Sequence, residues 1–324
     1  MAVFLDMGLT EYKNTILRLI AHYHRILSVA AIGRSHDGHG IYDIAIGNAA
    51  ADCHVVVHGA CHGREYLNAV MLCGLAEEYC TQFHSGAYDG ERYSAIFSKA
   101  CLHIVPILNP DGVMISRYGI HSIDNDRLRE GLSRIFAGER LSSATELTER
   151  AYFTRWKANA KGVDLNRNFN SGWADCVGNS APSAEKYKGV FYESEPETAA
   201  LARLVKNLNR RGVLRGVISY HSAGESIFWD FEQTGSRRAE SLALTEELCA
   251  LTGYAKESPA PDEAGCSDWV SRVLGLYACT METGRGDCPL DDAQLAEITE
   301  KNRYVPLAAL RFLSRAKGGG GDGI

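Results

Sequence analysis

The chain has 324 residues, of which 45% are hydrophobic and 23% are charged, a composition typical of a globular protein with a substantial core. Its formal net charge of -6 gives no basic surface of the kind that binds nucleic acid. No apolar run reaches the roughly 20 residues needed to cross a bilayer, so we expect no membrane partner. The first ten residues also lack the basic and apolar regions of a signal peptide, and we therefore expect a cytoplasmic protein.

Helix-like and strand-like segments alternate along the chain. Apolar residues at helical spacing predict helices at residues 11–27, 68–79, 146–156, 195–208, 241–251 and 295–315, with Ser194 as a candidate N-cap of the fourth. Runs rich in β-branched and other apolar residues predict strands at 28–34, 41–46, 54–58, 101–108, 213–220 and 277–281. The Asp37-Gly38-His39-Gly40 segment predicts a hairpin between the first two strands, and Asn109-Pro110-Asp111-Gly112 predicts a turn.

This alternation predicts an α/β fold with a mixed, mostly parallel sheet flanked by helices. We expect a single domain over residues 1–316 and a flexible Gly-rich tail at 317–324. Residues 115–160 are polar and irregular apart from the short helix, and a division into two domains within that segment is the alternative.

Ten cysteines are scattered along the chain and form no CxxC pair. They therefore encode neither a thiolate zinc site nor a thioredoxin-like motif. We expect most of them to be small buried hydrophobic residues.

A candidate metal site begins with His62-Gly63-Arg64-Glu65, directly after the predicted strand at 54–58. Catalytic zinc usually takes three protein ligands and leaves a fourth position for water, so one further ligand is required. His221 is the favoured third ligand because it follows the buried strand at 213–220, and sites in α/β sheets gather at the carboxyl ends of strands. His58 is the alternative, but it ends a strand and should not converge with His62.

Two further segments carry groups that a peptidase needs. Asn166 and Arg167, in a turn-rich stretch, suit a bidentate grip on a substrate carboxylate, although Arg167 could instead pair with Asp164 or Asp111 within a loop. Glu282 follows the strand at 277–281, where a buried carboxylate beside zinc could move a proton. A strand-end surface Glu is the alternative.

In this order, these segments resemble the zinc metallocarboxypeptidases of peptidase family M14. The resemblance spans nearly the whole chain and rests on five motifs: His62-Gly63-Arg64-Glu65, Asn109 to Gly112, Gly162 to Phe169, His221-Ser222 and Thr280 to Gly284. It implies a single domain around a twisted mixed sheet and one Zn²⁺ per chain, held by His62, Glu65 and His221. It further implies that Asn166 and Arg167 hold the substrate's carboxylate, with Ser222 as a further substrate-binding position, and that Glu282 is the base that activates the zinc-bound water.

A finer resemblance is to bacterial γ-D-glutamyl-diaminopimelate peptidases, which cut cell-wall peptides. It rests on segments such as Arg155 to Asn159, Tyr220 to Glu225, Ser194 to Thr198 and Gly265 to Trp269. The position that sets side-chain preference in the family is Ser267, and we expect its small polar side chain to suit the long zwitterionic side chain of diaminopimelate.

The chain departs from the digestive carboxypeptidases at two positions. Lys157 stands where those enzymes carry the Arg that polarises the scissile carbonyl, and Lys lacks the guanidinium fork. The mobile Tyr of those enzymes is not matched, because the corresponding position is Ala260 and Tyr254 is out of register.

The sequence therefore predicts a zinc peptidase that hydrolyses an amide bond beside a free carboxylate in a small peptide or muropeptide, between γ-D-glutamate and meso-diaminopimelate. A general carboxypeptidase on ordinary peptides and an N-acyl amino-acid deacylase are the alternatives with the same metal chemistry. A zinc-binding module without catalysis is the non-enzyme alternative.

Overall fold

The computed structural model describes residues 8–143, 147–259 and 263–315, and eight strands of this part form one sheet in the order β1-β2-β6-β3-β7-β10-β8-β9. The eight strands are β1 (Leu27–Arg34), β2 (Gly40–Gly47), β3 (His54–His58), β6 (Cys101–Val105), β7 (Leu214–His221), β8 (Ser226–Phe228), β9 (Ala255–Glu257) and β10 (Tyr277–Glu282). The central strands β6, β3, β7 and β10 run parallel, whereas β1 and β2 are antiparallel additions at one side and β8 is antiparallel to β10. The prediction of a mixed, mostly parallel sheet is confirmed.

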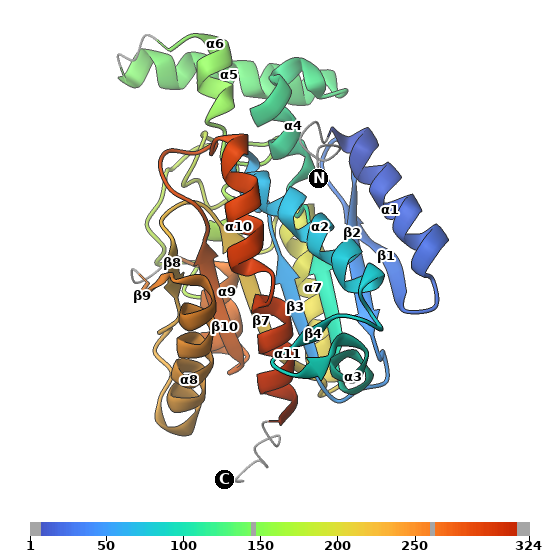
Figure 1. Cartoon of the computed structure of the whole chain (residues 1–324). Helices are drawn as coiled ribbons and strands as arrows, with labels where there is room; N and C mark the ends of the chain where they lie inside the picture. Colours follow the sequence, from blue (N-terminus) through green and yellow to red (C-terminus); the bar gives the residue numbers. More distant parts are fainter. Residues whose placement is uncertain (1–7, 144–146, 260–262, 316–324) are drawn as a thin grey trace.

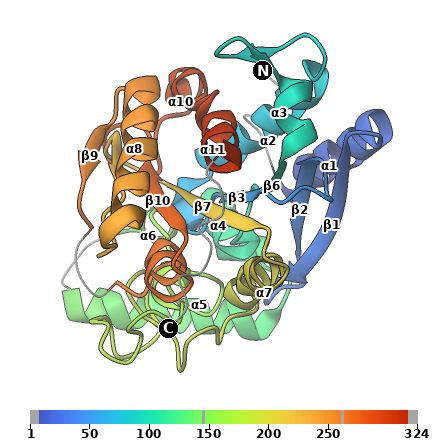
Figure 2. The ribbon, with the colours of Figure 1, turned by 90° about the horizontal axis from the view of Figure 1, so that it is seen from below.

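Helices cover both faces of this sheet (Figure 2). One face carries α1 (Leu9–Tyr23), α2 (Leu67–Thr81), α3 (Tyr93–Lys99), α8 (Gly235–Thr252), α10 (Leu295–Asn302) and α11 (Val305–Arg315). The other face carries α7 (Pro196–Arg210) and the short α9 (Cys266–Asp268). A small hairpin, β4 (Ala87–Tyr88) with β5 (Glu91–Arg92), lies outside the main sheet. Buried strands such as β3 are apolar on both sides because both faces of the sheet are covered.

Three further helices form a separate group across one end of the molecule (Figure 1). These are α4 (Pro110–Tyr118), α5 (Asp126–Ser143) and α6 (Glu149–Thr154), and they share a hydrophobic cluster of their own, which includes Phe153 and Trp156. The short helix predicted at 146–156 corresponds to α6, but two other predictions for this region were wrong. Asn109 to Gly112 is the N-cap and first turn of α4 rather than a free turn, because the Asn109 side chain accepts a hydrogen bond from the Gly112 N–H. Residues 115–160 contain the 18-residue helix α5 instead of an irregular segment.

Other predicted elements need smaller corrections. The C-terminal helix divides into α10 and α11, and the first helix ends at Tyr23 rather than Leu27. Ser194 does not cap α7, whose N-cap is Glu195 without a side-chain cap hydrogen bond. The Gly-rich tail at 317–324 lies outside the described residues. All ten cysteines are free, and eight of them are buried, as expected. Among the described residues, no helix is both long and apolar enough to span a membrane.

Two glycines are expected to respond in opposite ways to replacement by alanine, because Gly33 lies at the contact between α7 and β1 and Gly74 does not. A Cβ at Gly33 would lie 2.5 Å from the Ala200 Cβ, whereas a Cβ at Gly74, inside α2, meets nothing within 4 Å. We expect Gly33→Ala to lower the free energy of unfolding by about 1–3 kcal/mol through overpacking. Gly74→Ala should raise it by up to about 1 kcal/mol through helix propensity. Urea denaturation measures both, and equal effects would contradict this account of the α7–β1 contact.

Candidate active site

Three side chains predicted as metal ligands meet at the carboxyl ends of β3 and β7. His62 Nδ1 lies 2.8 Å from Glu65 Oε1, and His221 Nδ1 lies 3.0 Å from Glu65 Oε2 and 3.1 Å from His62 Nδ1. All three residues are buried, and the group is one of those whose ligand atoms could hold a metal ion. Two imidazole nitrogens and a carboxylate that converge in a buried place have the donor set of a catalytic zinc site.

The tautomer of His62 favours a cation among His62, Glu65 and His221. Its Nε2 lies 3.2 Å from Asp164 Oδ1, a carboxylate with no exposed surface, so Nε2 carries the hydrogen and Nδ1 presents a lone pair to the cluster. A carboxylate behind a ligating His fixes the ring and raises its basicity. The residues present therefore fit a zinc ion.

The loop that carries His62 and Glu65 is held by close backbone packing. A short 3₁₀ turn, η1 (Gly63–Glu65), follows His62, and a Cβ at Gly63 would lie 2.3 Å from the Gly112 carbonyl oxygen. The Gly63 N–H donates to the Lys157 carbonyl. Asn109 Nδ2 donates to the carbonyls of Cys61 and Ala158. The start of α4 thus fixes the metal-binding loop, which explains why the glycines and Asn109 occur in these motifs.

Asp164 and Lys157 form an ion pair beside the cluster. Lys157 Nζ lies 3.5 Å from Asp164 Oδ2, and the Lys186 N–H donates to the same carboxylate. Burial acts to raise the pKa of Asp164, but the charges of Lys157 and His62 outweigh it and hold the pKa well below its usual value. Burial acts to lower the pKa of Lys157, but the carboxylates of Asp164 and Glu65 outweigh it, and the amine stays charged.

Glu282 lies at the end of β10, next to His221, with which it pairs in the parallel register. Its side chain is partly exposed, and within the described residues its carboxylate has no hydrogen-bond partner. Burial and then the nearby Glu65 carboxylate raise the pKa of Glu282 to about 8. A perturbed carboxyl group beside a candidate metal site is a typical functional feature.

Arg167 and Asn166 lie in the short helix η3 (Leu165–Arg167). Arg167 Nη2 donates to Glu263 Oε1 at 2.8 Å, and Nη1 donates to the Asn166 carbonyl. Asn166 Oδ1 accepts from the Cys266 N–H, which fixes the orientation of its amide. The guanidinium does not pair with Asp164 or Asp111, the alternatives that the sequence left open; its salt bridge is with Glu263.

Two further predicted residues lie on either side of β10. Ser267 is buried, and its hydroxyl bonds with Ser219 on β7 and Thr280 on β10. Ser222 Oγ accepts from Asn68 and faces Thr283. Ala260, the position matched to the mobile Tyr, lies outside the described residues.

The remaining histidines do not join the cluster. His58 Nε2 lies 2.8 Å from Ser219 Oγ and is not part of the group formed by His62, Glu65 and His221. His54 and His103 bond with each other within the sheet, and His84 and His121 are exposed.

Sequence reasoning missed the roles of three residues of the site. Asp164 is the partner of His62, Asn109 holds the metal-binding loop by hydrogen bonds to its backbone, and Glu263 is the partner of Arg167. Asp164 and Asn109 were noted in motifs, but the sequence carries no signal for the long-range partner of either one. Glu263 lies in no motif.

Comparison with known proteins places the chain in a family. A family model described as zinc carboxypeptidase matches residues 12–305, and the chain belongs to this family. An uncharacterized protein of Bacillus subtilis, YqgT, is 29% identical over 293 residues, which cover 88% of this chain and 72% of the relative. Gamma-D-glutamyl-L-diamino acid endopeptidase 1 of Lysinibacillus sphaericus is 27% identical over 300 residues, which cover 92% and 70% of the two chains.

The solved structure of thrombin activatable fibrinolysis inhibitor has the same fold. Its TM-score is 0.73 at 18% identity, with 96% of this chain and 75% of the other chain covered. The chain is therefore a metallopeptidase-family hydrolase with a zinc-carboxypeptidase-like fold, and the family resemblance read from the sequence is confirmed.

Replacement of Asp164 tests whether the layer behind His62 tunes metal affinity. Asp164→Asn removes the charge that fixes the His62 tautomer, and we expect zinc affinity to fall roughly 10–100-fold. Competition with a chromophoric chelator measures the dissociation constant, and Asp175→Asn, at an exposed position, is the control. Unchanged affinity in a folded Asp164→Asn protein would contradict this role.

Proposed function

We propose that this protein is a zinc peptidase that hydrolyses the amide bond between γ-D-glutamate and meso-diaminopimelate in cell-wall muropeptides. The observation that carries the peptidase proposal is the meeting of His62, Glu65 and His221 beside Glu282, with Arg167 close enough for its charge to act on Asp164. The chain belongs to the zinc carboxypeptidase family. The choice of the γ-D-glutamyl-diaminopimelate bond as the substrate goes beyond that family membership.

In this proposal His62, Glu65 and His221 hold one zinc ion. When bound, zinc acts as a Lewis acid on the scissile carbonyl and activates water at neutral pH. Asp164 keeps the Nδ1 lone pair of His62 directed at the metal.

Glu282 is the proton carrier. Its carboxylate takes a proton from the attacking water and gives it to the departing amine. Among the described residues the carboxylate has no hydrogen-bond partner, so it is available to the attacking water and to the departing amine. Its raised pKa is suited to accepting a proton and releasing it.

Arg167 and Asn166 orient the substrate by its carboxylate. Glu263, which is 41% exposed at the side chain, already places a carboxylate oxygen 2.8 Å from the Arg167 guanidinium. A substrate carboxylate would displace this exposed partner and gain a charge-assisted contact with Arg167. Lys157 then supplies a positive charge for the oxyanion that develops at the scissile carbonyl.

Two observations support the diaminopimelate specificity. The relative from Lysinibacillus sphaericus is named a gamma-D-glutamyl-L-diamino acid endopeptidase. The hydroxyls of Ser267, Ser219 and Thr280 form a polar group between β7 and β10, next to the end of β10 that carries Glu282. In this proposal these hydroxyls, of which those of Ser267 and Ser219 are buried, lie behind a substrate side chain that ends in both an amine and a carboxylate.

Substitution of Glu282 separates catalysis from metal binding. We expect Glu282→Gln to lower kcat by at least about 100-fold, because the proton carrier is lost, while bound zinc stays at one ion per chain. Release of diaminopimelate from L-Ala-γ-D-Glu-meso-diaminopimelate measures activity, and Glu240→Gln, at an exposed site on α8, is the control. Equal release by wild type and Glu282→Gln would remove Glu282 from the mechanism.

A substrate panel tests the specificity. We expect kcat/KM for the γ-D-glutamyl peptide to exceed that for α-linked peptides ending in Leu, Phe or Lys. Efficient cleavage of the α-linked peptides alone would identify a general carboxypeptidase instead, and cleavage of N-acyl amino acids alone would identify a deacylase.

A further inference from the structure

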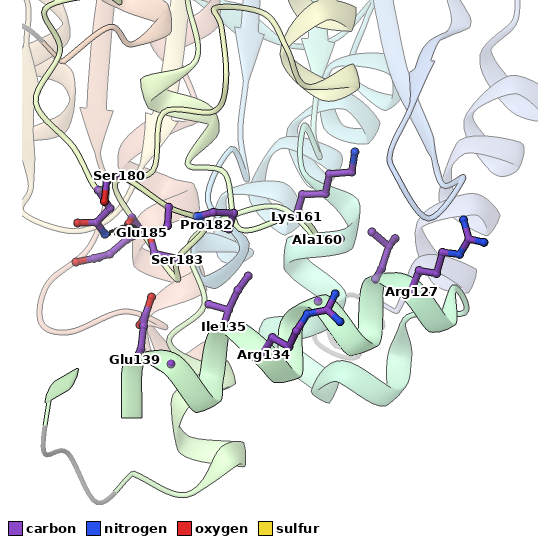
Figure 3. A pocket seen from close by; sticks show the side chains of 15 residues that line it. Arg127, Arg134, Ile135, Glu139, Ala160, Lys161, Ser180, Pro182, Ser183 and Glu185 are labelled. Carbon is purple, nitrogen blue, oxygen red and sulfur yellow. Dashed lines mark hydrogen bonds between the residues drawn. The ribbon is translucent and has the colours of Figure 1, made fainter. Parts of the chain in front are cut away.

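A cavity of about 990 Å³ lies between α5 and the segment at residues 179–185, outside the zinc cluster (Figure 3). Its volume is at the upper end of ligand sites, which run from roughly 300 to 1,000 Å³. The α5 wall carries Leu128, Gly131, Ile135 and Gly138 at helical spacing, and Pro182 lies on the opposite wall.

The two glycines keep this cavity open. Both lie inside α5, and a Cβ at either position would meet nothing within 4 Å. A glycine within a helix costs about 1 kcal/mol relative to Ala, and close packing gives no reason for it here. Gly131 and Gly138 are seven residues apart, on the stripe that faces the cavity, so larger residues there would fill the hollow.

The charges of the cavity select an anionic occupant. Arg127, Arg134 and Lys161 lie on the side of the cavity away from Glu139 and Glu185 (Figure 3), and in the described part of the chain none of the three has a carboxylate within ion-pair distance. The two acids of the lining have other partners: Glu139 accepts from the Ala184 N–H, and Glu185 pairs with Arg64 at 3.4 Å. The unmatched charge in the cavity is positive.

The cavity shares a wall with the catalytic cluster. Glu185 lines the cavity and forms an ion pair with Arg64. In the sequence, Arg64 stands between the candidate ligands His62 and Glu65. The Ala184 carbonyl accepts from the N–H groups of Lys157 and Ala158, and the Lys186 N–H donates to Asp164. One stretch of chain therefore borders both sites.

We propose that this cavity binds an anionic extension of the substrate on the amino side of the scissile bond. The extension would place a carboxylate against Arg127, Arg134 and Lys161 and an apolar portion against Leu128 and Ile135. The proposal rests on the peptidase function proposed above and adds a second recognition site remote from the bond that is cut.

The test compares two substrates that are identical at the scissile bond. One is L-Ala-γ-D-Glu-meso-diaminopimelate, and the other carries an added succinyl-Ala-Ala group, which reaches roughly 10 Å further. We expect wild type to prefer the extended substrate in kcat/KM. Gly131→Leu and Gly138→Leu should reduce this preference roughly tenfold by filling the cavity, and Arg134→Glu should reduce it similarly by charge reversal. Added salt should weaken the wild-type preference.

Matched controls lie away from the cavity. Gly74→Leu on α2 changes another mid-helix glycine that faces open space, and Arg92→Glu reverses another exposed cation. Neither should alter the preference between the substrates, and thermal unfolding reports whether each variant is folded.

A binding measurement separates the cavity from catalysis. Calorimetry with the uncleavable fragment succinyl-Ala-Ala-L-Ala-γ-D-Glu should show binding to wild type and weaker binding to Gly131→Leu. If wild type cleaves neither substrate, the proposed function fails, whereas binding of the fragment would still support the cavity. If it cleaves both substrates equally and Gly131→Leu binds the fragment as wild type does, the cavity proposal is wrong.

Discussion

The burial of negative charge at the carboxyl ends of the central strands is the constraint on which this site depends. Glu65 is 4% exposed and Asp164 is 0% exposed, and Glu282 adds a third carboxyl group beside them. Lys157 supplies one positive charge in the same space. Buried charge must be paired or must coordinate a metal, so the cluster is electrostatically suited to a divalent cation. The raised pKa of Glu282 reports the same surplus of negative charge.

The sheet brings these groups together from distant parts of the chain. The parallel strands β3, β7 and β10 are neighbours, and their carboxyl ends meet at one edge. His221 at the end of β7 thereby meets Glu65 after β3, although 156 positions separate them in the sequence. The site still requires support from outside the sheet. Asn109 at the start of α4 and Asp164 before η3 hold the metal-binding loop and the His62 ring. A loop without these partners would be free to turn Glu65 away from His221.

The sequence predicted the parts of this arrangement that follow from local pattern. The strand at 54–58 was placed at its observed bounds because three consecutive valines are typical of a buried parallel strand. His62, Glu65, His221 and Glu282 could be found because each follows such a strand or its turn. Helix α5 was not predicted, because its charged residues and two glycines interrupt the apolar stripe on which periodicity depends. Partners such as Asp164 for His62 and Glu263 for Arg167 depend on tertiary contacts, for which local pattern gives no information.

The region that the sequence predicted least well also contacts the segments around the candidate site. Helices α4, α5 and α6 have their own hydrophobic cluster, so they can vary without repacking the sheet core. Yet Glu139 of α5 holds the Ala184 N–H, and the segment from Ala184 to Lys186 contacts both Lys157 and Asp164. A ligand seated against α5 would therefore press on the same backbone that positions the charges behind His62. If the cavity beside α5 binds substrate as proposed, the hydrogen bonds of residues 184–186 link that binding to the residues beside the candidate metal ligands. A peptidase arranged in this way can distinguish substrates by groups far from the scissile bond without changing the groups that cut it.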